Sequence, residues 1–236
     1  MKLLDLPHDL RDRRMFGFFD DFEWYLSPHR WTSLAADAGA SVAAGASSTG
    51  GAVLLTTGAV DNNECAVATT QRPYRPADDK PILFEARLQY TEAAINAANL
   101  FAGLADVLGS ADLLQDNGNG PRASFHGTGL FKVDGDSVWR CVSARGAVQT
   151  ITVGTTPAGG TAPQTLRVEI QPLDAINAEV TFYVDDAAVR DVNGQPVKHS
   201  VSLAAFPAIQ AGVYAKAGSA ASEIVSVDYI AAYQLR

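Results

Sequence analysis

Residues 82–90, with the sequence ILFEARLQY, alternate between apolar and polar side chains from Phe84 onward. The polar positions Glu85, Arg87 and Gln89 all fall on one side of an extended chain. The opposite side carries only apolar or aromatic side chains: Ile82, Phe84, Ala86, Leu88 and Tyr90. A period of two residues is typical of a strand that buries one face and exposes the other. The stretch therefore predicts a half-buried β-strand.

The same alternation recurs at 166–171, 179–185 and 224–235. Less regular apolar runs predict further strands at 52–57, 64–70, 99–105, 123–133, 137–143, 147–153 and 209–215. Clusters of Asp, Asn and Gly separate the runs, and such residues favour turns. The cluster Asp134-Gly135-Asp136 joins two short strands and predicts a hairpin. About a dozen short strands in one chain predict an all-β fold, an antiparallel two-sheet β-sandwich of the jelly-roll type.

Helical signals are few. Residues 92–98 could form a turn or two, and 106–115 are the best candidate for a short surface helix. Two segments rich in Ala, Gly, Ser, Thr and Pro, 35–48 and 154–163, are interpreted as surface loops. We expect a single sandwich domain over 20–236, preceded by an N-terminal arm over 1–19.

Composition excludes several classes of protein. Hydrophobic residues make up 47% of the 236 residues and charged residues 19%, which excludes a disordered chain. The net charge of −8 argues against nucleic acid as a partner, because phosphate binding needs a positive patch. No apolar run approaches the ~20 residues that span a bilayer, and the first residues do not resemble a secretory signal. We therefore expect neither nucleic acid nor membrane as a partner.

The two cysteines, Cys65 and Cys141, lie far apart, and each falls within an apolar run. They could form a disulfide only if their strands were neighbours. Buried free thiols are the favoured interpretation, and they suit a reducing cytoplasm.

Two stretches of the second half resemble the paired strands of the concanavalin A-like lectin and glucanase superfamily. These are TLRVEIQPLDAINAEVTFYVDDAAV (165–189) and PAIQAGVYAKAGSAASEIVSVDYIAAYQL (207–235). The resemblance implies a lectin-like, laminin-G-like sandwich. It does not imply one function, because this fold serves many.

The layout of the chain also resembles head-associated structural proteins of tailed bacteriophages. The stretches that carry this resemblance are FDDFEWYLSPHRWTSLAADAGASVA (19–43), 52–71, 81–106 and 131–154. It implies a non-enzymatic decoration or cement protein on the capsid surface of a virion, assembled in the cytoplasm of the bacterial host. The expected partners are the major capsid protein and further copies of the chain, as a homodimer or homotrimer. On this hypothesis Phe16, Phe18 and Phe19 of the arm are apolar contacts to a partner; the alternative is an arm folded back on its own core.

Residues that could support catalysis are sparse. The Glu-x-Asp-x-x-Glu motif of the superfamily's hydrolases is missing, and Glu85 and Glu169 each stand alone on their strands. The sequence has no nucleophile elbow, and His126 has no evident catalytic partner. We therefore expect no catalytic residue and no organic cofactor. A glycoside hydrolase is the third and least favoured hypothesis.

The sequence is compatible with two kinds of binding site. Asp116, Asn117 and Asn119 supply oxygen atoms that could take part in a calcium site, although they equally suit a turn. A carbohydrate-binding module of a tail fibre or surface protein is the second functional hypothesis. It requires exposed aromatic side chains, and the candidates are Trp24, Tyr25, Trp31, Trp139 and Tyr214.

Overall fold

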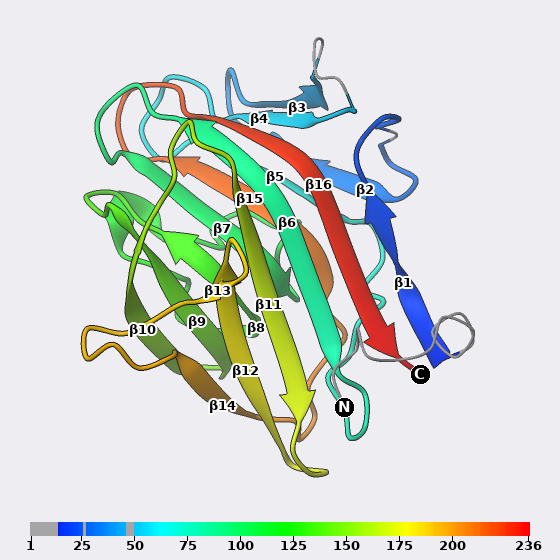
Figure 1. Ribbon diagram of the computed structural model, residues 1–236. Coiled ribbons are helices and arrows are strands. Elements are labelled where there is room, and N and C mark those ends of the chain that lie inside the picture. Colours follow the sequence, from blue (N-terminus) through cyan, green and yellow to red (C-terminus); the bar gives the residue numbers. More distant parts are fainter. Residues whose placement is uncertain (1–13, 26, 46–49) are drawn as a thin grey trace.

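The computed structural model describes residues 14–25, 27–45 and 50–236, and its strands form two antiparallel sheets packed face to face (Figure 1). Sheet A has nine strands: β1 (Met15–Asp20), β3 (Ser41–Ala44), β4 (Val53–Thr56), β6 (Ile82–Thr91), β11 (Gln164–Pro172), β12 (Asn177–Val184), β13 (Ala187–Ala188), β14 (Lys198–Ser202) and β16 (Ile224–Leu235). Sheet B has seven strands: β2 (Trp31–Leu34), β5 (Glu64–Thr69), β7 (Ala98–Ala105), β8 (Phe125–Lys132), β9 (Val138–Gly146), β10 (Val148–Pro157) and β15 (Gln210–Ala217). The predicted all-β, two-sheet sandwich is confirmed.

The strand order is β13-β12-β11-β6-β16-β4-β3 in sheet A, with β1 paired to β16 and β14 paired to β12. In sheet B the order is β10-β9-β8-β7-β15-β5-β2. The predicted hairpin at Asp134-Gly135-Asp136 joins β8 to β9, with a positive φ at Gly135.

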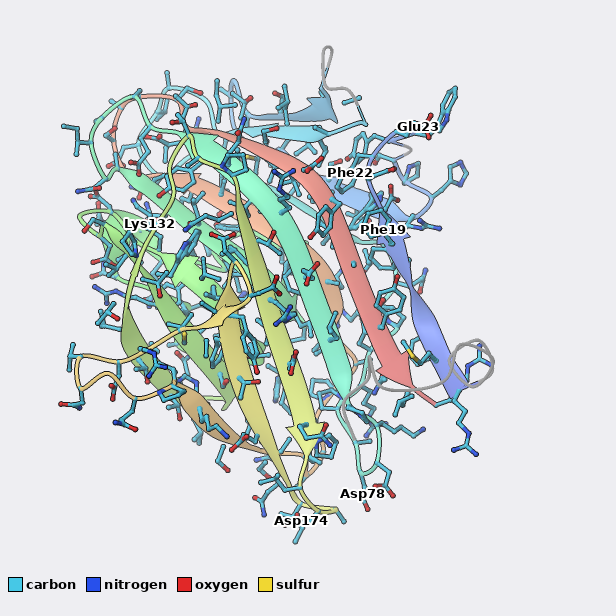
Figure 2. All side chains as sticks on the ribbon, in the orientation of Figure 1. Phe19, Phe22, Glu23, Asp78, Lys132 and Asp174 are labelled. Atoms are coloured by element: carbon cyan, nitrogen blue, oxygen red, sulfur yellow. The ribbon has the colours of Figure 1, made fainter. Side chains whose placement is uncertain are left out.

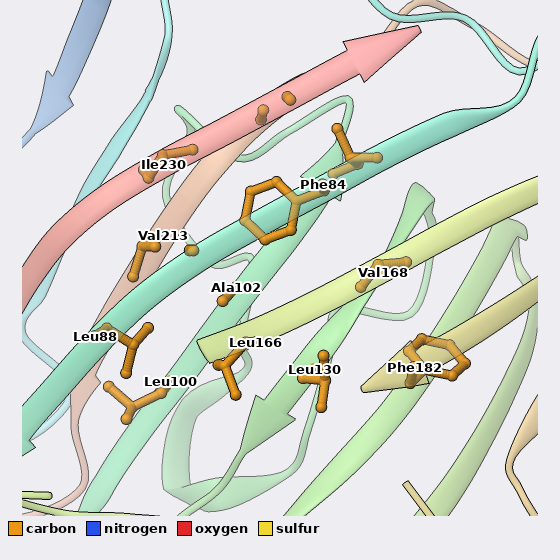
Figure 3. Close-up of a cluster of buried hydrophobic side chains, with 14 of the residues drawn as sticks. Phe84, Leu88, Leu100, Ala102, Leu130, Leu166, Val168, Phe182, Val213 and Ile230 are labelled. Atoms are coloured by element: carbon orange, nitrogen blue, oxygen red, sulfur yellow. The ribbon is translucent and has the colours of Figure 1, made fainter. Parts of the chain in front are cut away.

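The main core lies between the sheets and takes the apolar face of each strand. Phe84 of β6 stands opposite Val168 of β11, which in turn stands opposite Phe182 of β12. Figure 3 shows these side chains facing Leu130 of sheet B. The alternation seen at 82–90 therefore corresponds to one face in the core and one face in solvent.

Trp139 belongs to this core and is fully buried. Its indole Nε1 donates a hydrogen bond of 2.8 Å to Oε1 of Gln164, and its ring meets Tyr90 edge to face. A buried tryptophan usually needs a partner for its N–H, and Gln164 supplies it.

A second, smaller core covers the outer face of sheet B. The segment 106–122 runs across that face and buries Leu108, Leu113 and Leu114 against aromatic side chains such as Phe101. The predicted helix over 106–115 is therefore wrong. Asp112 has a positive φ of 59°, and long-range backbone hydrogen bonds such as Arg122 N to Leu113 O replace a helical ladder.

The N-terminal end of the described chain belongs to the sandwich. Residues Met15 to Asp20 form β1, which pairs along its whole length with the end of β16. The expected boundary between residues 19 and 20 falls inside this strand. Residues 1–13 of the expected arm lie outside the described residues.

Two expected loops contain strand. Within 35–48, Ser41–Ala44 pairs with β4 as β3, and within 154–163, β10 continues to Pro157. Backbone pairing holds β3 in its sheet with little help from side chains, because Val42 is its one partly buried side chain and the other three are exposed. Residues 46–49 of the first segment lie outside the described residues.

Cys65 on β5 and Cys141 on β9 are buried free thiols, on strands that are not neighbours in sheet B. Burial, together with the nearby Glu64 carboxylate, raises the pKa of Cys65 to about 12.

No helix within the described residues is long and apolar enough to cross a membrane.

Candidate binding site

The loop between β1 and β2 is organised by one carboxylate, Asp20. Its Oδ1 accepts the backbone N–H of Phe22 at 3.0 Å. Its Oδ2 accepts Nε1 of Trp31 at 2.9 Å and pairs with Nη1 of Arg30 at 3.0 Å. Phe22 is buried and has a positive φ of 57°, which folds the loop back on Trp31, with ring centroids 5.1 Å apart. One side chain thus fixes both ends of the loop.

This loop encloses a hollow of about 430 Å³ at the edge of the sandwich. Its lining includes Phe19, Asp21, Glu23, Trp24, His29 and Arg30. Trp24 is 78% exposed and Phe19 is 54% exposed, and Figure 2 shows Phe19, Phe22 and Glu23 gathered where β1 ends. Single exposed hydrophobic side chains are ordinary, but two large aromatic rings beside one hollow are typical of a contact surface. We call this feature the aromatic corner.

A row of side chains continues from the aromatic corner across the outer face of sheet A. The strand registers place five residues in one line: Phe19, Ala231, Glu85, Arg167 and Tyr183. The line crosses β1, β16, β6, β11 and β12 and spans about 19 Å, given a strand spacing of about 4.8 Å. Tyr229 lies beside it, with its ring 5.1 Å from that of Phe19. The row is therefore a shallow, elongated surface with an aromatic ring at each end.

Arg167, the fourth residue of the row, connects its charged side chains. Its guanidinium lies 4.5 Å from the Tyr183 ring and forms ion pairs with Glu85 at 3.6 Å, with Glu169 at 3.3 Å and with Asp186 at 2.5 Å. Partial burial opposes the charged form, but the hydrogen bond that Arg167 donates to Asp186 and the negative charges of its three partners outweigh burial and raise the pKa of Arg167. Glu85 and Glu169 stand alone on their strands as acidic residues, but both reach one arginine: the pairing of β6 with β11 places Glu85 opposite Arg167, and Glu169 lies two residues further along β11.

The three phenylalanines predicted to contact a partner divide between the two faces of β1. Phe16 stacks on Tyr74 at 5.7 Å, and Phe18 meets Trp31 edge to face at 5.3 Å, so both are packed against the main core. Phe19 points to the opposite face and stays exposed. Of the three, Phe19 is the side chain that a partner can reach.

The other aromatic candidates for a sugar site are mostly inside the protein. Trp31, Trp139 and Tyr214 are buried, and Tyr25 is half-buried with its hydroxyl on Ser33. Trp24 is the exposed member of the set.

The calcium candidates do not converge on a common point. Asp116 forms an ion pair of 2.6 Å with the buried Lys216. Asn119 donates its side-chain N–H to the backbone oxygen of Asp116, and the backbone N–H of Asn117 donates to Asn62. Among the residues that the structure describes, no group of three or more His, Cys, Asp or Glu side chains could hold a metal ion. Asp116, Asn117 and Asn119 therefore act here as a turn tied to Lys216.

His126 has a partner that the sequence did not reveal. Its Nδ1 lies 3.1 Å from Oδ2 of Asp106, and its backbone N–H donates to Oδ1 of the same residue. Asp106 thereby joins the end of β7 to the start of β8.

Solved structures with the same arrangement of sheets fix the type of fold. The carbohydrate recognition domain of Emp46p (Y131F mutant) superposes with a TM-score of 0.56 at 16% identity, covering 86% of this chain and 87% of that one. The endo-1,3-β-glucanase of Streptomyces sioyaensis gives 0.56 at 13% identity, with 94% and 96% covered. The chain has the concanavalin A-like sandwich fold. A protein of unknown function from Shewanella oneidensis MR-1 gives a TM-score of 0.59 at 12% identity, with 94% and 87% covered.

At these identities the likeness establishes the fold and no more. The set includes a carbohydrate recognition domain and a glucanase, and the Emp46p domain also has a potassium-bound form. No protein-family model and no curated protein matches the sequence.

Proposed function

We propose that the chain is a non-catalytic virion protein, a decoration protein of a tailed-phage head, and that the aromatic corner is its contact with the major capsid protein. The observation that carries the proposal is the exposure of Trp24 and Phe19 beside one hollow. Tryptophan and arginine are enriched among the residues that dominate protein–protein affinity, and Arg30 completes the corner.

Two further features support this assignment. The layout of 19–43, 52–71, 81–106 and 131–154 resembles phage head proteins, and the first of these stretches contains the whole aromatic corner. A subunit with net charge −8 also keeps a crowded particle surface in solution.

A binding role is favoured over hydrolysis by the state of the two carboxylates on the row. Glu85 is held by Arg167 and by the Tyr229 hydroxyl at 2.7 Å, and Glu169 is held by Arg167. A retaining or inverting hydrolase needs one free carboxylic acid and one free carboxylate facing the substrate. Both groups are already engaged with protein side chains.

Removal of the Trp24 side chain tests the proposal. We expect Trp24→Ala to weaken binding to phage heads that lack the protein by about 30-fold or more, since loss of a central aromatic contact costs about 2 kcal/mol. Co-sedimentation with such heads, read as copies bound per major capsid subunit, measures this. Ile95→Ala is the matched control, because Ile95 is 92% exposed on a distant loop. Wild-type protein that does not bind heads, or equal binding by both variants, would refute the assignment.

Glycan binding along the row is the second candidate function. The specific observation is the alignment of Phe19, Glu85, Arg167 and Tyr183, because aromatic rings at the ends of a polar strip suit the apolar faces and hydroxyls of a sugar chain. The Emp46p carbohydrate recognition domain shares the fold and is consistent with this candidate in a general way.

Two variants separate the candidates. If a glycan lies along the row, Phe19→Ala and Tyr183→Ala should each lower the affinity for it about tenfold, since the two rings lie at opposite ends of the row. A capsid contact at the corner should respond to Phe19→Ala alone. A glycan array followed by calorimetry with the strongest binder measures the first effect, and an array without any signal would exclude this candidate.

A further inference from the structure

Strand β10 forms one end of sheet B and pairs with β9 alone in the strand order. The β9–β10 hairpin has a two-residue turn, Gly146-Ala147, with Gly146 at a φ of 62° and Arg145 opposite Val148. In such a hairpin the closing pair is hydrogen-bonded, and the pairs then alternate. The backbone N–H and C=O groups of Gln149, Ile151 and Val153 therefore point away from β9, toward the open edge.

The edge of β10 is covered further along the strand. Beyond Val153, where the pairing with β9 becomes irregular, the backbone N–H of Thr155 donates to the carbonyl of Arg190 at 2.9 Å. Gly154 is buried there under Val189. The segment 189–190 thus covers the second half of the edge, and the first half, from Gln149 to Val153, stays open.

The open half lacks the usual protection of a sheet edge. Natural edges carry lysine, proline, short strands or bulges that prevent pairing with another chain. Residues 146–156 contain no charge and no proline, and the irregularity of β10 comes only after Val153. Val148 is 75% exposed, Ile151 45% and Val153 42%. The other end strands of the two sheets are shorter than β10: β1 has six residues, β14 five, β2 and β3 four each, and β13 two.

We propose that β10 is a self-association edge, at which a second copy of this chain adds its own β10 in antiparallel register about a two-fold axis at Ile151. Gln149 of each copy then stands opposite Val153 of the other, and about six backbone hydrogen bonds close the open edge. This inference is independent of the capsid and glycan assignments.

Charge and symmetry both favour a second copy of this chain as the partner that pairs with the open edge of β10. Each chain carries a net charge of −8, so two copies repel unless they meet at a neutral surface, and β10 is such a surface. An antiparallel strand is complementary to itself about a two-fold axis. In this register Ile151 meets Ile151 on the outer face, and Thr150 meets Thr152 on the inner face. Both kinds of cross-strand pair are favourable.

A lysine on the two-fold axis tests the proposal. Wild-type protein should be a dimer at micromolar concentration by light scattering coupled to gel filtration. Ile151→Lys places two like charges opposite each other and should raise the dimer dissociation constant by about 100-fold or more. Val192→Lys adds the same charge at a loop position that is 79% exposed and should leave the dimer intact. Circular dichroism and the melting temperature check that both variants are folded.

A cysteine variant tests directly whether the two β10 strands lie side by side in the dimer. Ile151→Cys places two sulfurs across a hydrogen-bonded pair, with Cα atoms about 5.5 Å apart, a distance that a disulfide spans. Mild oxidation should give a covalent dimer of Ile151→Cys and none of Val192→Cys, because the two native thiols are buried. A monomeric wild type, a trimer, or a dimer that survives Ile151→Lys and resists cross-linking would each overturn the proposal.

Discussion

We expect Asp20→Ala to lower the free energy of unfolding by about 3 kcal/mol and to remove binding at the aromatic corner. The carboxylate accepts hydrogen bonds from Phe22 and Trp31 and pairs with Arg30. Only 13% of its side chain is exposed, and Trp31 is buried, so loss of the acceptor leaves a buried indole N–H without a partner. An unsatisfied buried donor costs about 1–3 kcal/mol, and hydrogen bonds to a charged group contribute about 1.5–3 kcal/mol.

Two variants show whether the effect belongs to this carboxylate. Asp20→Asn keeps one acceptor oxygen and should cost about half as much as Asp20→Ala. Asp21→Ala removes an exposed neighbour whose Oδ1 only accepts the N–H of Glu23, and it should change stability by less than about 1 kcal/mol. Urea unfolding followed by tryptophan fluorescence measures all three. If Asp20→Ala and Asp21→Ala were equally stable, Asp20 would not organise the loop.

The strands that were predicted well from the sequence are those with one buried face. At 82–90 every second side chain enters the core, and this burial is the physical origin of the alternation. At 224–235 the predicted alternation holds as far as Val227; a register shift between Val227 and Tyr229 then turns Ile230 and Ala232 into the core in place of Tyr229 and Ala231. β3 escaped prediction because its side chains are almost all outside the core and only its backbone takes part in the sheet. The segment 106–115 was misassigned as a helix for a related reason. Its leucines are buried against the outer face of sheet B, and no local pattern reveals that contact.

The candidate site was predictable only in part. Phe19 was among the expected contacts, and Trp24 was among the expected sugar-binding rings. Their meeting beside one hollow depends on the fold of the loop after Asp20. The row on sheet A could not be found from sequence, because Glu85 and Arg167 are 82 positions apart and meet through strand register. Register is fixed by packing of the opposite, apolar faces, which sequence alternation does not specify across strands.

Glu223, just before β16, is a fully buried acid that neither candidate function uses. Its backbone is fixed by Thr57, whose N–H donates to the Glu223 carbonyl and whose hydroxyl accepts the Glu223 N–H. No well-formed hydrogen bond reaches either carboxyl oxygen. Burial, followed by the negative charge of Glu92, raises the pKa of Glu223 to about 7, although the backbone N–H of Ala93 and the positive charge of Lys132 oppose the shift.

The sign of the pH dependence follows from this shift. The folded protein holds the Glu223 proton more tightly than the unfolded chain, whose pKa is near the ordinary value of 4.5. The stabilising effect of the neutral form is therefore complete below about pH 4.5 and is lost as the pH rises through 7. The rise in the pKa of Glu223 from 4.5 to about 7 corresponds to about 3 kcal/mol.

We therefore expect Glu223→Gln, which cannot ionise, to stabilise the protein at high pH. The difference in unfolding free energy between variant and wild type should rise from near zero at about pH 4, through about 1 kcal/mol at about pH 5, to about 3 kcal/mol at about pH 8.5. Urea unfolding at half-unit steps of pH measures this difference. Because the wild-type free energy is subtracted, the contributions of all other titrating groups cancel. Asp78→Asn removes one exposed carboxylate and should give a nearly flat difference over the same range. A flat difference for Glu223→Gln as well would mean that Glu223 ionises in the folded protein without cost, through solvent or a cation that reaches its carboxylate.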